Sequence, residues 1–432
     1  MNSVAFHTLG CKVNQYETEA MEELFEKNGY NVVGEEGYSD IYVINTCTVT
    51  NLSDRKSRQF IRKSKKKNPD AIVAVVGCYS QVSPEEVENI EGVDVIIGTS
   101  ERGRIVELCE EASSTKKKIN IVRSVKTYKE FEKIDIDKLK SRTRAFVKIQ
   151  DGCNQFCSYC IIPYARGPIR SRKYGEIETE IKKLSKAGFK EIVLTGIHVA
   201  SYGKDLKKES IGEVIDKISL IEGIERIRLS SLEPTLIDDD FMGIMTKSYK
   251  ICDHFHLSLQ SGSDTVLKRM SRKYTTEDYR ERVRLIREYL PDAGITTDII
   301  VGFPGETEEE FKETMNFVEE IGFSRIHVFK YSPRKGTPAA IMENQIHGET
   351  KNMRSETLIA LGDRLSKEFN SKYLDKTKDV LYEEHTKKNS DVYEGYTSNY
   401  IRVRTPSNVD IIGKIQATKL SGIKNSYIEG AL

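Results

Sequence analysis

The chain has 432 residues and a formal net charge of +1 at pH 7, with 67 lysines and arginines against 66 acidic residues. A charge this close to zero excludes nucleic-acid binding driven by the whole molecule, so such binding would need local basic patches. No apolar run approaches the ~20 residues of a membrane-spanning helix, so no membrane partner is expected. The length predicts two or three domains of roughly 100–200 residues each.

The chain contains eight cysteines. Its first residues, Met1–Val4, lead directly into a strand pattern, so we expect no signal or transit peptide and a cytoplasmic location. In a reducing cytosol, several cysteines indicate metal ligation rather than a disulfide framework.

Residues 1–115 alternate short apolar runs with charged helical stretches. Strands are expected at 4–9, 41–44, 71–76 and 94–98. This alternation predicts an α/β domain built on a doubly wound parallel sheet.

Three cysteines, Cys11, Cys47 and Cys78 (the first trio), each follow the carboxyl end of a different expected strand. Ligands bind at that edge of an open α/β sheet, so we expect the three thiols to converge on one iron–sulfur cluster with an open fourth position. The alternative is three unrelated buried thiols, because a free cysteine is a common core residue. Cys109 lies at an apolar position of an expected helix and is assigned to the core.

One lysine-rich stretch lies within this domain and a second follows it. Residues 55–67 hold a dense run of lysines and arginines on an expected helix. The run is either a solvated helix face or a contact for phosphate groups. Residues 116–140 are polar and weakly patterned, so we expect an interdomain linker with an edge strand at 119–122.

The alternation of strands and helices resumes over residues 141–370. The expected strands are 145–150, 191–195, 225–230, 254–259, 296–301 and 325–331, and the expected helices between and after them are 175–187, 210–221, 235–247, 276–289, 306–321 and 350–370. Six such units predict a partial TIM-type (β/α)6 barrel, whose chemistry would sit on the loops at the carboxyl ends of the strands.

The loop after the first of these strands carries Cys153, Cys157 and Cys160 (the second trio) in the spacing C-x3-C-x2-C. A structural zinc site normally takes four protein ligands, and the loop offers no fourth cysteine or histidine nearby. A [4Fe–4S] cluster is normally held by four cysteines, so three would leave one iron open to bind a substrate. We therefore favour a catalytic iron–sulfur cluster over a zinc site or an inert thiol loop.

Other loop residues at the carboxyl ends of the strands are candidates for cofactor binding. These are Gly196, Glu233, Gln260, Gly302 and Gly305. Glu233 and Gln260 have side chains that could bond ribose hydroxyls, while Gly196 would let backbone carbonyls approach a ligand. Simple turn chemistry is the alternative for the glycines.

The segment 164–173, directly after the second trio, is basic and broken by glycine and proline. We expect it to be an exposed loop in which Arg166 and Arg170 contact RNA phosphate or a cofactor carboxylate. His256, inside a strand pattern, is expected to be a core histidine, and Cys252 a free thiol.

Residues 371–432 contain five short strand-like runs, which predict a small β-barrel. Aromatic and basic residues interleave there: Tyr393, Tyr396, Tyr400, Arg402 and Arg404. Aromatic rings beside cations suit single-stranded or loop RNA. Barrel packing with ordinary surface charge is the alternative.

The second trio resembles the signature of the radical S-adenosylmethionine (SAM) superfamily. That resemblance implies that Cys153, Cys157 and Cys160 ligate a [4Fe–4S] cluster whose open iron binds SAM, and that the chemistry runs through a radical derived from SAM. In such enzymes the cofactor carries the hard chemistry, while the protein orients it and excludes water.

The chain as a whole resembles the methylthiotransferase family, in which a cluster-binding N-terminal domain, a radical SAM core and a C-terminal TRAM barrel that binds RNA follow one another. Thr8 to Thr18 and Cys160 to Gly167 are similar to its MtaB branch. The GCQMN motif of the isopentenyladenosine branch and the GCPKN motif of the ribosomal-protein branch do not fit Gly10 to Asn14. The domains expected are 1–115, the linker 116–140, the core 141–370 and the TRAM barrel 371–432.

This resemblance implies an enzyme that adds a methylthio group to C2 of N6-threonylcarbamoyladenosine, next to the anticodon of tRNA. It also implies two [4Fe–4S] clusters, two SAM molecules per turnover, and a flavodoxin- or ferredoxin-like electron donor. One alternative is a sister enzyme acting on isopentenyladenosine tRNA or a ribosomal protein. Another is a non-catalytic iron–sulfur protein that binds RNA.

Overall fold

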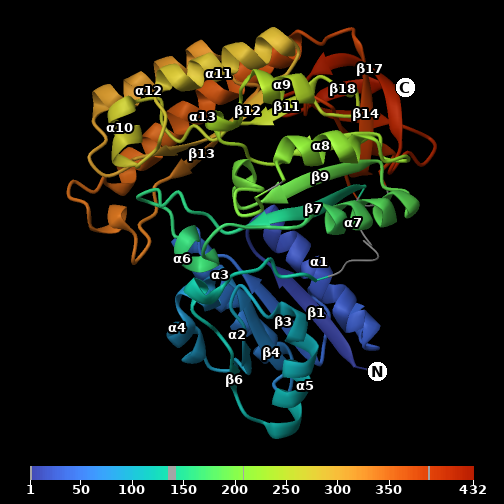
Figure 1. Ribbon diagram of the computed structural model, residues 1–432, viewed down its shortest axis with the longest axis vertical. Coiled ribbons are helices and arrows are strands. Elements are labelled where there is room, and N and C mark those ends of the chain that lie inside the picture. Colours follow the sequence, from blue (N-terminus) through green and yellow to red (C-terminus); the bar gives the residue numbers. More distant parts are fainter. Residues whose placement is uncertain (1, 135–142, 208, 388–389) are drawn as a thin grey trace.

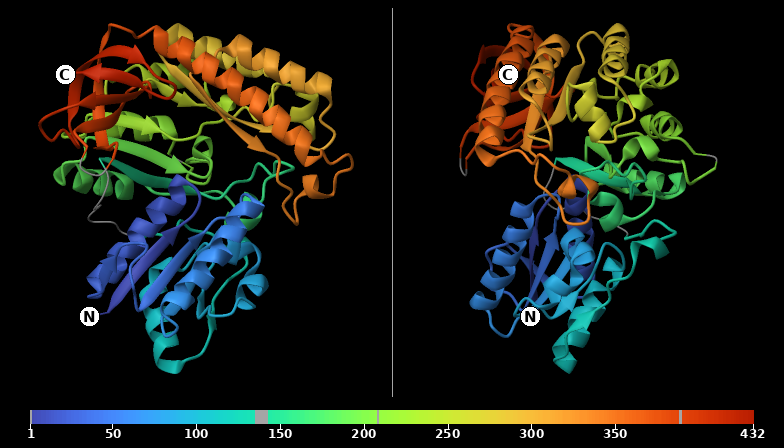
Figure 2. Two further views of the ribbon diagram at one scale, coloured as in Figure 1. Left: turned by 180° about the vertical axis from the view of Figure 1, so that it is seen from behind. Right: turned by 90° about the vertical axis from the view of Figure 1, so that its left-hand side faces the viewer.

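The computed structural model describes residues 2–134, 143–207, 209–387 and 390–432. Figure 1 shows the N-terminal domain in blue to teal below the central domain in green to orange, with the C-terminal barrel in red at one end of the central domain. The two further views keep the same arrangement (Figure 2). Among the helices of these ranges, none combines the length and apolarity required to cross a membrane.

The N-terminal domain is a parallel sheet with strand order β2-β1-β3-β4-β5-β6 in the described residues. The strands are β1 (Ser3–Thr8), β2 (Asn31–Val33), β3 (Ile41–Thr46), β4 (Ile72–Gly77), β5 (Val95–Ile96) and β6 (Ile119–Asn120). The helices are α1 (Lys12–Lys27), α2 (Asn51–Lys67), α3 (Cys78–Val82), α4 (Pro84–Glu88) and α5 (Ile105–Thr115). Every residue of β3 and β4 is buried, as expected for a sheet with helices on both faces.

The predicted α/β class and parallel sheet are therefore confirmed. The edge strand expected at 119–122 is β6, which pairs with β5 and completes the first sheet. The part of the expected linker at 135–140 lies outside the described residues. The domain boundaries remain predictions.

The central domain contains β7 (Arg144–Asp151) and a short antiparallel neighbour, β8 (Arg170–Ser171). The further strands are β9 (Glu191–Gly196), β10 (Arg226–Leu229), β11 (His254–His256), β12 (Gly294–Val301) and β13 (Arg325–Lys330). The helices are α6 (Ile162–Arg166), α7 (Tyr174–Lys186), α8 (Ile211–Ser219), α9 (Asp239–Met245), α10 (Asp264–Arg269), α11 (Thr276–Tyr289), α12 (Glu308–Ile321) and α13 (Gly348–Ser371).

The strands of the central domain form two sheets, β10-β9-β7-β8 and β11-β12-β13. Parallel bridges from Ile227 to Ile251 and from Leu232 to Leu257 join the sheets into one arc. One large core lies between this arc and its helices, so the arc is open along one side, where the N-terminal domain lies. The predicted partial (β/α)6 barrel is confirmed, with its strands and helices close to the expected positions.

The C-terminal residues form a closed barrel of strand order β14-β15-β16-β18-β17 in the described part of the chain. Its strands are β14 (Thr377–His385), β15 (Val392–Thr397), β16 (Arg402–Pro406), β17 (Ile415–Ile423) and β18 (Ile428–Ala431). Buried Arg226 and Arg228 of β10 donate hydrogen bonds to backbone carbonyls of this barrel. The barrel is thus fastened to the end of the central domain.

Candidate active site

The first trio assembles at the carboxyl edge of three adjacent parallel strands. In the sheet register Thr8 pairs with Asn45 and Thr46 with Gly77, so β1, β3 and β4 end level with one another. Cys11 caps α1, Cys47 follows β3, and Cys78 begins α3. Burial, with the neighbouring Cys78 and Cys11, raises the pKa of Cys47 to about 12. The loop before Cys11 also lies against Cys47, because a Cβ on Gly10 would be 3.0 Å from its Sγ. Ligation of one cluster by the three thiols remains a prediction.

Gly10 makes this convergence sterically feasible. Its φ is +109°, and a Cβ there would lie 2.7 Å from Cβ of Cys47. Asn14, on the first turn of α1, donates hydrogen bonds to the carbonyls of Leu9 at 2.7 Å and Thr46 at 3.0 Å. The loops that carry Cys11 and Cys47 are thereby held together.

The second trio occupies one tight loop after β7. Gly152 turns the chain with φ +73°, where a Cβ would lie 1.9 Å from the carbonyl oxygen of Pro168. The amide of Cys160 donates a hydrogen bond to the carbonyl of Cys157 at 2.9 Å. Burial raises the pKa of Cys153 to about 11 and that of Cys160 to about 12.

Both trios have the donor chemistry that an iron–sulfur cluster needs. Burial raises the pKa of Cys47, Cys78, Cys153 and Cys160, so bound iron would be needed to hold these side chains as thiolates. Hydrogen-bond donors already point at the sulfurs of the second trio: the Gln155 amide lies 3.4 Å from Sγ of Cys153, and Nη1 of Arg272 lies 3.4 Å from Sγ of Cys157. In the first trio, Arg166 hydrogen-bonds the Cys78 side chain, and burial raises the pKa of that thiol.

Glu233 lies beside the second trio. Its carboxylate accepts a hydrogen bond from Nε2 of Gln155 at 2.9 Å, pairs with Arg272 at 3.2 Å, and contacts the ring of His198. Burial opposes its ionisation, but His198 and Arg272 lower its pKa. Glu233 is therefore a charged carboxylate next to the predicted SAM site.

The other predicted cofactor residues are less clearly placed. Gly196 ends β9 and lines a cavity, packed against the side chain of Gln150. Gln260, with φ +73°, lines a smaller cavity together with Cys160. Gly302 and Gly305 form a turn in which the Gly302 amide donates to Glu306 at 2.6 Å. Their positive φ values of +70° and +73° satisfy the turn, so cofactor binding by these glycines remains a prediction.

The expectation that Arg166 and Arg170 lie on an exposed loop is wrong. Arg166 is completely buried and donates to Oε1 of Glu17 at 2.5 Å and to Oδ1 of Asn14 at 2.7 Å, while Arg170 bonds backbone carbonyls of its own loop. The segment is enclosed between the two domains, where the carboxylates of Glu17 and Asp151 require cations. A basic sequence cannot show whether its partners are solvent or buried acids.

A buried ion network thus connects the two trios. Glu17 of α1 pairs with Lys148 at 2.7 Å, with Arg166 at 2.5 Å and with Arg102 at 3.2 Å, and Lys148 also pairs with Asp151 at 2.6 Å. Burial would raise the pKa of Glu17, but the three cations lower it to about 2. The network joins the helix behind Cys11 to the strand before Cys153.

A further contact between domains lies next to Cys47. Arg334 of the central domain donates to Thr48 at 2.6 Å, to Asp54 at 2.5 Å and to Asn51 at 2.5 Å. No role was predicted for this arginine from the sequence. Its position in a loop after a strand of the central domain could have indicated this contact, because such loops face the first domain in the folded chain.

The remaining cysteines, His256 and the basic run of residues 55–67 lie outside the two trios. Cys109 is fully buried in the core of the first domain, as expected, and Cys252 is a buried free thiol. His256 is not a simple core residue: its ring is partly exposed in a cavity, where Nε2 lies 3.3 Å from Oδ2 of Asp298. The basic run forms most of α2, and phosphate binding by it remains a prediction.

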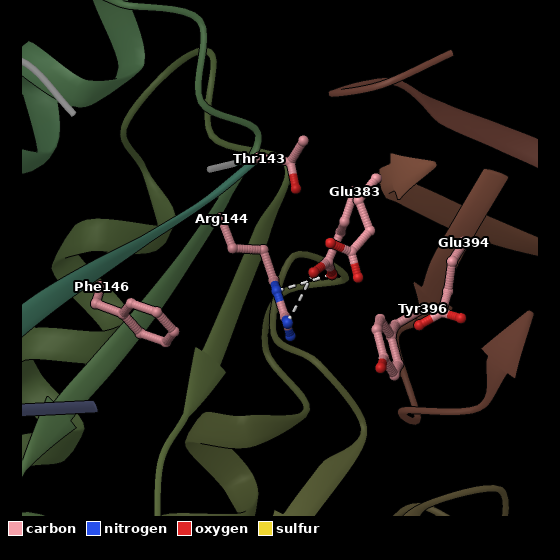
Figure 3. Close-up of a pocket in the computed structure, with 7 residues that line it drawn as sticks. Thr143, Arg144, Phe146, Glu383, Glu394 and Tyr396 are labelled. Carbon is pink, nitrogen blue, oxygen red and sulfur yellow. Dashed lines mark hydrogen bonds and ion pairs between the residues drawn. The ribbon is translucent and has the colours of Figure 1, made fainter. Parts of the chain in front are cut away.

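The aromatic residues of the barrel do not form one exposed RNA-binding row. Tyr393 belongs to the barrel core. Tyr396 and Tyr400 stack with ring centroids 4.9 Å apart, and both face Arg144 of β7. Figure 3 shows Arg144 reaching Glu383 of the barrel, beside a cavity of about 470 Å³. These rings help to dock the barrel on the central domain.

Arg402 and Arg404 are also engaged within the barrel. Both pair with the buried carboxylate of Glu394, at 2.7 Å and 2.8 Å. Their role in RNA binding therefore remains a prediction. Binding of RNA phosphate by either arginine would have to replace its ion pair with Glu394.

A cavity of about 600 Å³ opens between the N-terminal domain, the central domain and the C-terminal barrel. Cys11 and Lys12 line it from the first domain, and Tyr400 lines it from the C-terminal barrel. Its central-domain wall includes Gly196, Ser230, His254, His256, Asp298, Arg325, His327 and Phe329. Asp298 and Phe329 also line the smaller cavity that contains Cys160, so the two trios open onto adjoining spaces.

Comparisons with known proteins agree with this arrangement. Residues 147–318 match the radical SAM superfamily, and residues 3–98 match the uncharacterized protein family UPF0004. The chain is 46% identical to the threonylcarbamoyladenosine tRNA methylthiotransferase MtaB of Bacillus subtilis, over all of this chain and 96% of the relative. It is 38% identical to the MtaB of Thermotoga maritima, over 93% of this chain and 91% of that one.

Two further similarities are to proteins of other types. The chain is 39% identical to the tRNA-2-methylthio-N(6)-dimethylallyladenosine synthase of Clostridium tetani, over 98% of this chain and 94% of that one. Among solved structures, the radical S-adenosylmethionine methyltransferase TsrM of Kitasatospora setae aligns with a TM-score of 0.56 and 16% identity, over 79% of this chain and 77% of that one. The latter similarity concerns the fold alone.

Proposed function

The chain belongs to the radical SAM tRNA methylthiotransferases of the MtaB type, and from this premise we propose that it methylthiolates C2 of N6-threonylcarbamoyladenosine next to the anticodon of tRNA. The observation that carries the proposal is that one cysteine of each trio, Cys11 and Cys160, lines one of two adjoining cavities. Methylthiolation needs a source of radical chemistry and a source of sulfur close to the same base, and two cluster sites facing a shared space meet that need.

In this proposal Cys11, Cys47 and Cys78 would ligate one [4Fe–4S] cluster, and Cys153, Cys157 and Cys160 would ligate the other. When bound, SAM and the cluster of the second trio supply the radical chemistry that an unactivated C2–H bond requires, with a second SAM supplying the methyl group. The chain's own residues bind and orient. Glu233 holds a negative charge close to Cys157 through Arg272, where it can receive the hydrogen-bond donors of SAM.

The domains divide the remaining tasks. The C-terminal barrel and the basic α2 would contact the tRNA, because both place cations outside the buried ion network. A low-potential flavodoxin- or ferredoxin-like protein would supply electrons, and the enzyme would work in the cytoplasm. Arg144, which docks the barrel, also lies against Tyr400, and Tyr400 forms part of the wall of the cavity.

Mass spectrometry of tRNA nucleosides tests this function. A strain lacking the gene should lose 2-methylthio-N6-threonylcarbamoyladenosine and retain the unmethylthiolated nucleoside, and the gene supplied on a plasmid should restore the product. Persistence of the product in the deletion strain, with loss of the dimethylallyl-linked methylthio nucleoside, would assign the chain to the sister reaction instead.

A further inference from the structure

The large cavity contains two cations that lack an acidic partner. Lys12 and Arg325 both line it, on different domains, and both are exposed to it. Across the described ranges neither makes an ion pair within 4.0 Å or a hydrogen bond from its side chain. The nearby Arg144 and Arg228 differ, because Glu383 and Glu191 neutralise them at 2.8 Å and 2.7 Å. Both side chains are exposed in the cavity and have no carboxylate partner among the described residues to compete with a ligand, so the pair is available to bind an anion.

The neighbouring titratable groups favour an anion over a metal ion. His256, Asp298 and His327 offer ligand atoms within 4.8 Å of one another. The single carboxylate is already engaged by His256 at 3.3 Å. Burial lowers the pKa of His327, and Arg325 and Lys12 lower it further, which places both cations within electrostatic range of that ring. Two positive side chains beside the group would repel a divalent cation.

The walls of the same cavity suit a flat base. The rings of His254 and Tyr400 stack at 4.5 Å, and Phe146 and Phe329 also line the space. Aromatic side chains bind nucleobases by stacking in proteins that recognise unpaired RNA. At about 600 Å³ the cavity is within the usual size range of a small-molecule site. A nucleobase with an anionic substituent fits both the aromatic walls and the two unpaired cations.

We propose that Lys12 and Arg325 bind the carboxylate of the threonylcarbamoyl group and thereby select the acid-bearing adenosine over one with a hydrocarbon N6 substituent. This inference rests on the proposed function and names the specificity contact of the same site. The carboxylate, which is joined to N6 of the adenine through a urea linkage, would reach the two cations while the base rests among the aromatic side chains. A hydrocarbon substituent would leave both cations desolvated and unpaired, which disfavours its binding.

Two synthetic anticodon stem–loop RNAs test the contact, one with the threonylcarbamoyl carboxylate and one with the same group as a carboxamide. Affinity is measured by fluorescence anisotropy, and kcat/KM by single-turnover formation of the methylthio product under anaerobic conditions. The variants are Lys12→Gln, which removes the charge, Lys12→Arg, which keeps it, and Arg325→Gln. Lys27→Gln, on the exposed end of the same helix, is the matched control. Iron content is measured for every variant.

The wild-type enzyme and Lys27→Gln should prefer the carboxylate RNA by about 100-fold, the scale of a lost buried charge pair. Lys12→Gln and Arg325→Gln should lose most of this preference mainly by binding the carboxylate RNA less well, and Lys12→Arg should retain much of it. Equal affinity and equal kcat/KM of the wild-type enzyme for the two RNAs would overturn the inference. So would an equal loss for both RNAs in Lys12→Gln, because that pattern indicates an effect on the adjacent Cys11 alone.

Failure of the proposed function has a different signature. A wild-type enzyme that is loaded with iron but modifies neither RNA, and instead modifies the dimethylallyl form, would reject the substrate assignment and the carboxylate contact together. Modification of both threonylcarbamoyl RNAs at the same rate rejects only the contact.

Discussion

The first trio is assembled from three strands that are distant in sequence, whereas the second trio shares one loop of eight residues from Cys153 to Cys160. The first site exists only when β1, β3 and β4 are aligned and the loops after them are tied together by Asn14. The second is shaped by Gly152 and by local backbone bonds. A dispersed site therefore depends on the stability of its domain, while a local site depends on its loop and on the neighbours that cover it.

The largest expected effect comes from breaking the local site. Cys157→Ser should abolish both SAM cleavage and methylthio transfer, because the second trio would lose one of three ligands. Iron should fall from about eight to about four atoms per chain, since each cubic cluster holds four. Anaerobic iron analysis and chromatography of released 5′-deoxyadenosine measure these quantities. Full SAM cleavage by this variant would remove the second trio from the radical chemistry.

Breaking the dispersed site should separate the two activities. Cys47→Ser should also lose about four iron atoms per chain and all methylthio product, but it should still release 5′-deoxyadenosine. The reason is that the second trio and Glu233 lie in the other domain and are not touched by the change. Simultaneous loss of SAM cleavage in a folded Cys47→Ser protein would mean that the two sites are not independent.

The ion network behind both sites gives the next largest effect. Glu17→Gln should lower the free energy of unfolding at pH 7 by about 3–5 kcal/mol, because buried Arg102, Arg166 and Lys148 would lose a shared anion. The pKa of Glu17 is lowered to about 2 in the folded protein. Its stabilisation is therefore complete above the ordinary carboxyl pKa and is lost as the pH falls toward 2.

Urea unfolding of the apoprotein at pH 7 and pH 3 measures this dependence. The difference between wild type and Glu17→Gln should be largest at pH 7 and smaller at pH 3. Glu107→Gln, at an exposed ion pair on α5, is the control and should leave stability close to that of the wild type at either pH. A difference that grows toward acid would contradict the assignment of Glu17 as the charged centre.

A smaller change should affect the dispersed site alone. Gly10→Ala places a Cβ 2.7 Å from Cβ of Cys47 at a φ of +109°, so the first trio must distort. Gly29→Ala is the matched control, because its φ is +82° but no atom lies within 4 Å of the added carbon. Both should lose about 1–2 kcal/mol of stability from the backbone conformation. Only Gly10→Ala should also lose iron from the first site, and equal iron in both variants would show that the loop can relax.

The comparison of the two sites also explains what the sequence could predict. The second trio is visible in eight consecutive residues, and the strands and helices around it have clear apolar patterns. The first trio was predictable because each cysteine follows a strand end, which is a topological signal. Arg166 was misplaced because its acidic partner, Glu17, lies in another domain. Lys12 and Arg325 were missed for the same reason, since only the folded chain brings them to one cavity.

The smallest expected effect concerns the cysteines outside both trios. Cys252 is 2% exposed and lies near Arg228, and burial raises the pKa of its thiol to about 12. It therefore remains neutral and behaves as a small apolar side chain. Cys252→Ala removes one sulfur atom from the core and should cost about 1 kcal/mol of stability. Iron content and methylthio transfer should equal those of the wild type, so this variant is the reference against which Cys47→Ser and Cys157→Ser are compared. Loss of iron from Cys252→Ala would mean that a ligand lies outside the six assigned cysteines, and the division into one dispersed and one local site would fail.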